Sequence, residues 1–426
     1  MFRNYLKIAW RHLRKSRVYA FINIAGLASG MTAAFLIGLW VWDEITFDTY
    51  HRHYDRLAQV MVNQTSEGEI YTGSTIAMPV GEALRLHYRD NFRRISLVSF
   101  SGDDLVSIGT KRVTAKGIWA QADFPDMFTL EMIKGSRDAL KDPSAMMISE
   151  SLAKNLFGNE DPMNRVIRIV NRFDMKVAGV YRDLPPNTTF AGTVMLLAWD
   201  NPQNSYLNTN KDWVDHNGQL FVELADGVSA EQATAKIRNL PTPHVKGWHE
   251  EVMVYPMNKL HLWGDFSNGK ATGGLILFVR LFIIVACFIL LLACINFMNL
   301  STARSEKRAK EVGIRKTMGS GRTQLVRQFL SESLLTALLA FLFATVLTLL
   351  FLPFFNRLSG KAIVIPWGNP VFWCIALGFT LFTGIVAGSY PAFYLSGFRP
   401  VKVLKGIFKA GPYAAIPRQV LVVLQF

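Results

Sequence analysis

Cysteine, acidic residues and recognisable enzyme motifs are all scarce in this sequence of 426 residues. The three cysteines, Cys287, Cys294 and Cys374, all lie in long apolar runs, so a disulfide-stabilised secreted domain is excluded. HExxH, GxSxG, CxxC, GxGxxG and P-loop patterns are absent. The sequence therefore offers no familiar zinc, hydrolase, redox, dinucleotide-binding or ATPase site, and we predict no catalytic residue and no enzyme activity.

Negative charge is nearly missing from the two ends of the chain. Residues 1–17 hold six basic residues and no acidic one, and residues 275–426 hold 16 basic and three acidic residues. Residues 43–274 hold 24 basic and 29 acidic residues, so the formal net charge of +14 comes from the ends alone. Basic flanks around an acidic middle follow the positive-inside rule of membrane proteins, and we expect no nucleic-acid partner.

Four apolar runs are long enough to cross a bilayer, which takes about 20 residues of helix. They cover residues 18–42, 275–300, 330–355 and 371–395. The first run is too long for a cleaved signal peptide, and four such runs in one chain disfavour buried core helices. The flanking charges predict a cytoplasmic N-terminus, a domain outside the membrane at 43–274, and cytoplasmic segments at 301–329 and 396–426.

The basic N-terminus at residues 1–17 also has an apolar side. Its apolar residues recur among the cations at roughly helical spacing, which predicts a cytoplasmic amphipathic basic helix lying on anionic membrane lipid. These apolar residues are Tyr5, Leu6, Ile8, Ala9, Trp10 and Leu13. A plain topology signal, whose only role is to keep the N-terminus in the cytoplasm, explains the same charges.

The long polar segment at 43–274 carries both strand and helix patterns. Short apolar or alternating runs predict strands at residues 57–64, 166–170, 175–181, 220–224 and 252–255. Helices are predicted at residues 79–88, 150–157 and 230–240, the last with Ser229 as its N-cap. The predicted fold class is an α-helical membrane protein with four transmembrane helices and a large α+β extracytoplasmic domain inserted between helices 1 and 2.

The densest group of potential metal ligands follows the first apolar run. It consists of His51 and His53 with Asp48 and Asp55. Two histidines two residues apart share a face only on a strand, and no third ligand follows at a diagnostic spacing. We therefore expect no metal site in this chain.

The cytoplasmic stretch at 301–333 reads as a charged helix, a glycine break and a second helix that leads into the third span. Two acid–base pairs four residues apart support the first helix, which has only a thin apolar stripe. The pairs are Glu306–Lys310 and Glu311–Arg315, and the stripe is Ala309, Val312 and Met318. Such a helix can dock on a cytoplasmic partner or on anionic lipid, and its residues alone favour neither.

This stretch resembles the signature of FtsX-like ABC transporter permeases. The resemblance runs through Lys310, Glu311, Val312, Gly313, Ile314, Arg315, Lys316, Thr317, Met318 and Gly319, with Gln328, Phe329, Leu330 and Glu332 after them. Further stretches are similar to the MacB-like exported domain and to the end of the family's fourth span. They lie at residues 47–51, 148–158, 177–185 and 388–396.

The resemblance implies a permease subunit in the bacterial inner membrane whose segment at 310–319 contacts a separate cytoplasmic ABC ATPase. ATP would bind that partner, so this chain would hold no cofactor. In the family, closure of the ATPase moves the spans, which pass the motion to the exported domain; this mechanism is mechanotransmission. It serves efflux or the handling of lipoproteins, peptides or toxic compounds, with a periplasmic adaptor or an outer-membrane component as a further partner.

Two features depart from the family pattern. Asn164 stands where the exported domain commonly has a glycine, so we expect a differently shaped turn there. Residues 418–426 resemble the start of a fifth span, so the chain resembles the N-terminal half of a duplicated permease. A four-span protein with a short hydrophobic tail is the alternative, and the partner is accordingly a second permease half or a homodimer partner.

Two pairs of glycines four residues apart suit close helix packing, Gly26 with Gly30 and Gly384 with Gly388. A second class of function also stays open, because an FtsX-like signalling or scaffold protein would use the same cytoplasmic segment. Such a protein senses a ligand or activates an extracytoplasmic partner such as a cell-wall hydrolase. A membrane-anchored enzyme is disfavoured, because four spans exceed what anchoring needs and no nucleophile motif occurs.

Overall fold

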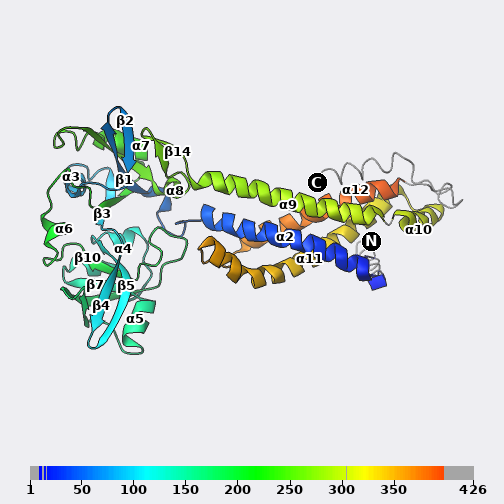
Figure 1. Cartoon of the computed structure of the whole chain (residues 1–426), viewed down its shortest axis with the longest axis horizontal. Helices are drawn as coiled ribbons and strands as arrows, with labels where there is room; N and C mark the ends of the chain where they lie inside the picture. The colour runs from blue at the N-terminus through cyan, green and yellow to red at the C-terminus, as the bar shows by residue number, and fades with distance from the viewer. Residues whose placement is uncertain (1–8, 12–13, 16, 304, 398–426) are drawn as a thin grey trace. The chain divides into compact units, whose positions relative to one another are not determined.

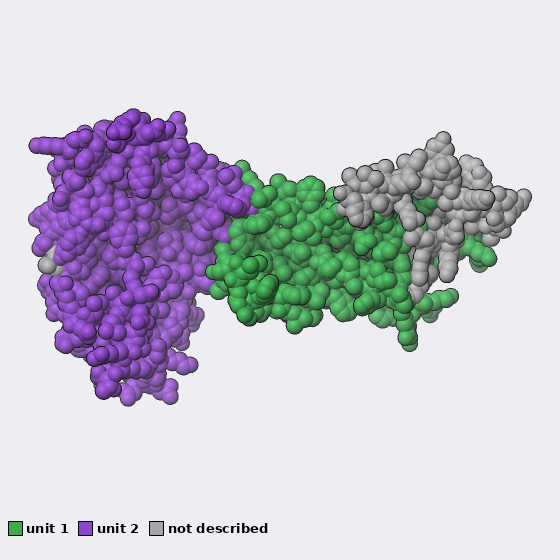
Figure 2. Space-filling model, in the orientation of Figure 1, with its two compact units in different colours: residues 1–42, 279–426 green, residues 43–278 purple. Residues whose placement is uncertain are grey.

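The computed structural model describes residues 9–11, 14, 15, 17–303 and 305–397, which belong to two compact units (Figure 2). We call the described part of residues 1–42 and 279–426 the membrane bundle, and residues 43–278 the α+β domain. Most of the predicted basic helix at 1–17, and the tail in which a fifth span was predicted, lie outside the described residues.

Four helices in the described chain are long and apolar enough to cross a membrane (Figure 1). They are α2 (Arg17–Ile45), α9 (Leu275–Ala303), α11 (Arg322–Ser359) and α12 (Pro370–Ser396). The charged helix α10 (Ser305–Thr317) follows α9. The chain is thus a multi-pass membrane protein, with its large polar domain between the first and second of these helices.

Small side chains fill the centre of the membrane bundle. Ala337, Ala340 and Ala387 are almost fully buried between the helices, while Leu350 and Phe354 are more than half exposed. Helices in lipid associate through close contact of small residues, because hydrocarbon solvates large apolar side chains as well as a protein core does. The exposed leucines and phenylalanines are therefore the surface that faces lipid.

The α+β domain contains short helices and 14 strands among the described residues, which confirms the predicted fold class. Its helices are α3 (Met78–His87), α4 (Phe124–Met127), α5 (Glu150–Phe157), α6 (Ser205–Thr209), α7 (Ala230–Ile237) and α8 (Met257–Leu260), with short 3-10 helices η1 (Tyr54–Arg56) and η2 (Arg137–Lys141). Its strands are β1 (Leu57–Ser66), β2 (Glu69–Gly73), β3 (Phe92–Val98), β4 (Gly102–Ile108), β5 (Lys111–Ala120), β6 (Met132–Gly135), β7 (Ala145–Ser149), β8 (Val166–Ile169), β9 (Phe173–Tyr181), β10 (Met195–Ala198), β11 (Gln219–Leu224), β12 (His249–Pro256), β13 (Asp265–Ser267) and β14 (Lys270–Gly273).

Twelve of these strands form one sheet, whose order is β10-β7-β9-β8-β4-β5-β3-β11-β1-β12 with β2 and β6 at its sides. An additional pairing between β10 and β5 closes six of the strands into a small barrel. We call this part the barrel lobe, and the part built on β1, β2, β3, β11 and β12 the sheet lobe (Figure 1). Within the sheet, β3 joins β5 through one residue pair, Val98 with Ala120.

Each lobe has its own apolar core, and an aromatic cluster joins them. Phe124, Phe128 and Phe190 lie with ring centroids 4.5–4.8 Å apart, and Phe221 of β11 contacts two of them at 5.4 Å. Edge-to-face packing of this kind adds about 0.5–1.5 kcal/mol per pair beyond burial. The cluster therefore stabilises the junction that the single β3–β5 pair alone would leave weak.

The helix predictions inside the α+β domain agree with the structure. Helix α5 spans the predicted residues, and α7 begins after Ser229, whose side chain caps it together with Gln232. Helix α7 ends at Ile237, three residues before the predicted end. Asn164 has φ +63°, so it adopts the left-handed conformation that a glycine would supply at this turn.

Candidate functional site

The predicted coupling segment folds as helix α10 and lies against the ends of α11 and α12. Val312 is 2% exposed and belongs to a buried cluster with Leu325 and Phe329 of α11 and Ala392 and Leu395 of α12. Contact between this one side chain and both helices fixes the rotation of α10. A displacement of α10 would therefore act on both α11 and α12.

Polar contacts reinforce the docking of α10. The Arg315 guanidinium donates to Glu311 Oε1 at 2.6 Å, the predicted pairing four residues apart, and also to the side-chain oxygen of Gln328 on α11. One arginine thereby links α10 to the helix that follows it. Charge-assisted hydrogen bonds of this geometry are stronger than neutral ones, so Arg315 holds the angle between the two helices.

The glycine break between α10 and α11 is a tight turn. Gly319 has φ +94°, which only glycine adopts easily, and the Ser320 N–H donates to the Arg315 carbonyl at 3.0 Å. Gly321 is the N-cap of α11, where its N–H donates to the Gln324 side chain at 3.3 Å. The turn thus fixes where the charged helix ends and the long membrane helix begins.

Among the described side chains, the opposite side of α10 and the residue that follows the helix are exposed and include apolar groups. Ile314 is 46% and Met318 is 81% exposed, and Lys310 and Thr317 are exposed on the same side. The predicted stripe is therefore wrong in one respect, because Val312 faces the bundle and Met318 faces away. The remaining residues of the predicted site are Gly313, which is buried, and Lys316, which is half-buried.

The glycine pairs lie at helix contacts inside the membrane bundle. A Cβ at Gly30 would collide with Ala293 of α9, and one at Gly26 would lie 3.3 Å from Asn296 of the same helix. On α12, a Cβ at Gly388 would lie 2.5 Å from Ser333 of α11, and one at Gly384 would lie 2.9 Å from Leu334. The glycines therefore permit close approach of α2 to α9 and of α11 to α12.

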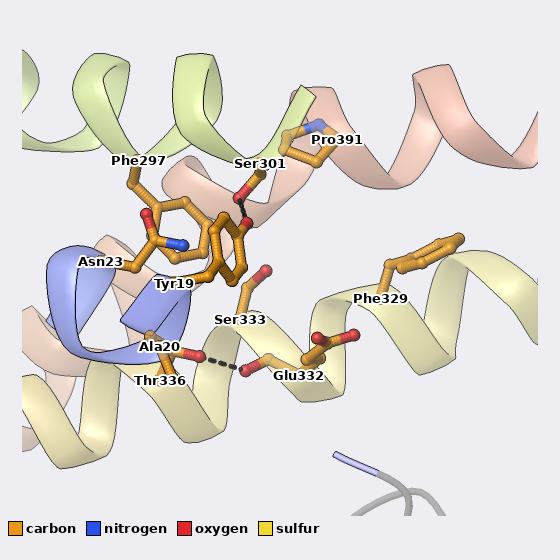
Figure 3. Close-up of a pocket in the computed structure, with 10 residues that line it drawn as sticks. All are labelled: Tyr19, Ala20, Asn23, Phe297, Ser301, Phe329, Glu332, Ser333, Thr336 and Pro391. Atoms are coloured by element: carbon orange, nitrogen blue, oxygen red, sulfur yellow. Dashed lines mark hydrogen bonds between the residues drawn. The ribbon is translucent and has the colours of Figure 1, made fainter. Parts of the chain in front are cut away.

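A small polar cavity of about 20 Å³ lies among helices α2, α9, α11 and α12 (Figure 3). Tyr19 Oη donates to Ser301 Oγ at 2.9 Å on one side, and Glu332 and Ser333 line the other. Asn23 is 3% exposed, and its Oδ1 has no hydrogen-bond partner within the described residues. A cavity of this size holds one water molecule, which could satisfy that oxygen.

Within the α+β domain, Asp48 attaches the residues that follow α2 to the rest of the domain. Its carboxylate accepts from Thr188 Oγ1 at 2.6 Å, Thr189 N at 2.8 Å and Thr189 Oγ1 at 2.7 Å. Burial opposes ionisation of Asp48, but these bonds and the adjacent His51 outweigh it and lower the pKa of Asp48 below 3.8. Asp48 is thus a buried, charged anchor, with a left-handed φ of +60°.

A second tie involves Glu44, in the last turn of α2. Its carboxylate contacts His261 Nε2 at 2.5 Å, and the His261 ring stacks on Phe47 with centroids 3.6 Å apart. Asn187 adds a third connection by donating to the Thr46 carbonyl at 3.3 Å. The end of α2 is therefore held from several directions by the domain it enters.

The two histidines considered as metal ligands in the sequence, His51 and His53, lie next to protein side chains. His51 is buried, 3.6 Å from Asp48, and His53 Nδ1 accepts from Arg56 at 2.8 Å. Across the described ranges, no group of three or more histidine, cysteine, aspartate or glutamate side chains is arranged to hold a metal ion. The sequence pattern did not reveal the role of Asp48, because its partners Thr188 and Thr189 are 140 residues away along the chain.

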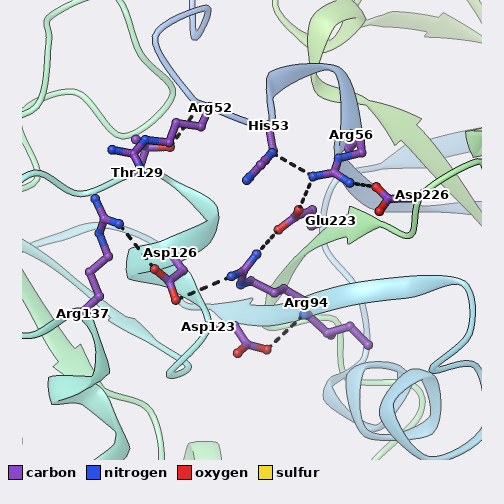
Figure 4. A network of polar contacts seen from close by, with 11 residues as sticks. Arg52, His53, Arg56, Arg94, Asp123, Asp126, Thr129, Arg137, Glu223 and Asp226 are labelled. Carbon is purple, nitrogen blue, oxygen red and sulfur yellow. Dashed lines mark hydrogen bonds and ion pairs between the residues drawn. The ribbon is translucent and has the colours of Figure 1, made fainter.

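A network of charges connects the two lobes (Figure 4). Glu223 of β11 is fully buried and contacts Arg56 at 3.1 Å and Arg94 at 2.6 Å. Arg94 also lies 3.8 Å from Asp126 of α4, which in turn lies 3.7 Å from Arg137 of η2. A buried carboxylate needs such partners, because removal of one would leave an uncompensated charge. The network thus holds the barrel lobe to the sheet lobe.

The arrangement defines a class: a membrane protein with four candidate spans, a charged helix docked on two of them, and a two-lobed α+β domain inserted after the first. Residues 20–240 match the model of the MacB-like periplasmic core domain, and residues 283–400 match that of the FtsX-like permease C-terminal domain. The chain belongs to this family of ABC transporter permeases.

Individual relatives are distant. The chain is 26% identical over 275 residues to a macrolide export ATP-binding/permease protein MacB of Bdellovibrio bacteriovorus, covering 61% of this chain and 38% of that protein. It is 25% identical over 263 residues to the ABC transporter permease YknZ of Bacillus subtilis, covering 61% of each. The periplasmic region of MacB from Actinobacillus actinomycetemcomitans matches with 15% identity and a TM-score of 0.36, over 49% of this chain and 91% of that structure.

Proposed function

We propose that the chain is the permease subunit of a MacB-like ABC transporter and depends on a separate cytoplasmic ATPase that binds ATP. The observation that carries this proposal is the two-sided helix α10. Val312 and Arg315 attach one side to the membrane helices, while Ile314 and Met318 offer an apolar patch on the other. The match of residues 283–400 to the FtsX-like permease C-terminal domain favours a protein partner for this patch over an anionic lipid surface.

The coupling would work by mechanical transmission. A force on the free side of α10 would reach α11 and α12 through Val312 and Arg315. Helix α2 would then deliver motion of the bundle to the α+β domain, because Asp48 and Glu44 fasten its end there. In this proposal the N-terminus and α10 lie in the cytoplasm, the α+β domain lies in the periplasm, and the membrane is the bacterial inner membrane.

The transported or handled substrate would be met by the α+β domain outside the membrane. Several relatives are named for macrolide export, and we extend to this chain only the class of activity, which is export or handling of a substrate outside the membrane. The working unit would contain a second permease half or a second copy. A periplasmic adaptor or an outer-membrane component would complete an efflux pathway.

The proposal is tested by recovering the tagged chain from native membranes in detergent and identifying its companions by mass spectrometry. We expect an ATPase with a P-loop to copurify with the wild type. The double variant Ile314→Glu/Met318→Glu should lose it, because both substitutions place charge in the exposed patch. Val166→Glu, at a 57% exposed position of the α+β domain, is the matched control and should keep it.

Two results would contradict the proposal. Equal recovery of the ATPase with the double variant would show that the free side of α10 is not the docking surface. Absence of any ATPase from a folded wild-type sample would favour the sensor or scaffold function, in which the α+β domain responds to a ligand or activates an extracytoplasmic partner.

A further inference from the structure

A cleft of about 280 Å³ opens on the α+β domain beside the residues that follow α2. Segments far apart in the sequence build it: residues 50–52, the loop after α4, η2 and the end of β9. Its polar lining is Tyr50, Arg52, Thr129, Glu131, Arg137, Arg182 and Asp183. Three arginines from three segments thus meet two carboxylates, Glu131 and Asp183, in one small cleft.

The charges in the cleft can be assigned one by one. Arg182 is paired with Glu131 at 2.9 Å, and Asp183 is exposed and accepts from Ser151 at 2.6 Å. Arg137 uses its Nε for the Leu130 carbonyl, and another of its nitrogens lies 3.7 Å from Asp126. Two of the three arginines are therefore engaged, at least in part, by protein groups.

Arg52 differs from the other two. Its guanidinium makes no hydrogen bond or ion pair with any described residue, although its backbone N–H donates to Thr129 Oγ1 at 3.0 Å. Figure 4 shows the guanidinium ends of Arg52 and Arg137 on the same side, next to Thr129. Arginine presents five N–H donors in a planar fork that matches phosphate and carboxylate geometry. Arg52 thus brings a complete, unused set of donors to the cleft.

The backbone of Thr129 is a further feature typical of a binding site. Thr129 has φ +51°, a left-handed conformation that is costly for a β-branched residue, and such strain gathers at functional sites.

We propose that this cleft binds the phosphoryl group of a phosphate monoester, with Arg52 as its principal ligand and Arg137 beside it. A phosphate monoester presents three terminal oxygens, and the planar forks of the two arginines supply enough N–H donors for all of them. The monoester is either a free metabolite-sized molecule or the headgroup of a lipid such as phosphatidic acid. Arg52 follows the end of α2, a candidate membrane span, by seven residues along the chain, so a lipid source is tested beside a soluble one.

The test uses the full chain in a maltoside detergent, with glycerol 3-phosphate as the probe and calorimetry as the readout. We expect saturable binding that weakens about tenfold or more in Arg52→Gln, because a charge-assisted contact is lost. Glu131→Gln should tighten binding, because it removes a negative charge and releases Arg182. Arg168→Gln, which breaks an exposed pair with Asp174 on β8 and β9, is the control and should bind as the wild type does.

Weaker binding by Arg52→Gln and tighter binding by Glu131→Gln would show that the cleft holds the ligand. A purely structural effect would not give opposite changes, because both side chains are exposed and lie outside the core. Repeating the titration in nanodiscs that contain phosphatidic acid, a lipid whose headgroup is a phosphate monoester, identifies the source. Loss of probe binding there would show that the lipid headgroup occupies the cleft, and unchanged affinity would show that a soluble ester does. Absence of binding in detergent, or equal binding by wild type and Arg52→Gln, would overturn the proposal. The proposal is independent of ATPase coupling.

Discussion

The membrane bundle and the α+β domain bury opposite kinds of side chain. In the α+β domain the largest fully buried residues include Tyr181, Phe124 and Phe128. In the bundle, Ala337 is fully buried while Phe382 is 61% exposed. Water drives large apolar side chains inward, whereas hydrocarbon exerts no such drive and close helix contact favours small residues. A large apolar side chain therefore stabilises the α+β domain by being buried, whereas in the membrane bundle the same side chain contributes little to helix packing.

The largest expected effect comes from removing one ring in each region. Phe128→Ala should destabilise the α+β domain by about 3–5 kcal/mol, because it empties the centre of the aromatic cluster at the lobe junction. Phe382→Ala should change stability little, since that ring lies on the lipid-facing surface. Thermal unfolding of the full chain in detergent measures both. Similar losses for the two variants would show that the bundle is packed like a water-soluble core.

The next effect concerns α10, the charged helix of the bundle. Gly313→Pro should break this helix at a cost of about 3 kcal/mol and abolish ATPase activity linked to the chain, while membrane insertion stays intact. Val166→Glu, at an exposed position of the α+β domain, should leave that activity unchanged. ATPase assays on reconstituted protein measure the difference. Full activity in the proline variant would remove α10 from the coupling pathway.

A third comparison stays within one membrane helix. Gly388→Val should destabilise the bundle by about 1–3 kcal/mol, because the new side chain meets Ser333 of α11. Gly378→Val is the matched control on α12, since a Cβ there meets nothing within 4 Å. Resistance to proteolysis in detergent reports both variants. If the two valines behave alike, the α11–α12 contact is looser than the structure indicates.

The smallest effect is a pH dependence confined to the α+β domain. His216 Nε2 lies 3.0 Å from Glu250, and its Nδ1 lies 2.8 Å from the Val214 carbonyl, so the protonated ring satisfies both contacts. The bond to Glu250 outweighs burial and raises the pKa of His216 above 6.5. Burial opposes ionisation of Glu250, but bonds from His216, Trp248 and Gln64 outweigh it and lower the pKa of Glu250 below 4.5.

The sign of this pH dependence follows from the two shifts. The contribution of His216 is fully present below pH 6.5 and is lost as the pH rises through its raised pKa. That of Glu250 is present above pH 4.5 and is lost as the pH falls through its lowered pKa. His216→Gln should therefore cost most, about 1 kcal/mol, between these two values. Unfolding curves of variant and wild type that stay parallel across the pH range would contradict the assignment.

Much of the architecture could be predicted because bilayer thickness and water impose simple patterns on the sequence. Span length and flanking charge identified the four long helices, and the period of α5 gave its bounds. Strands β4 and β5 were missed because their outward residues, such as Asp103 and Lys111, are charged and interrupt the apolar pattern. Barrel closure through β10 and β5 could not be predicted, because it joins strands about 80 residues apart.

In the candidate site, only contacts between residues close together in the sequence could be predicted. The pairing of Glu311 with Arg315 follows from helix geometry, and the structure contains it. The direction of Met318 does not follow, because α11 and α12 decide which side of α10 is covered. Likewise, nothing near Asp48 in the sequence announces the threonines it binds. The coupling roles of Asp48 and α10 are predictions, which copurification of the ATPase tests.

The closed ring of strands has a consequence for how the polypeptide acquires its shape. All six barrel strands come from one uninterrupted stretch, from Gly102 to Ala198, inserted between β3 and β11. Strand β1 pairs with its neighbour β2, but also with β11 and β12, which follow it by more than 150 residues. Closing a short loop costs less chain entropy than closing a long one, so the barrel strands can pair during synthesis before β11 and β12 are available to β1. The barrel lobe would then be the first part of the domain to resist proteolysis on the ribosome.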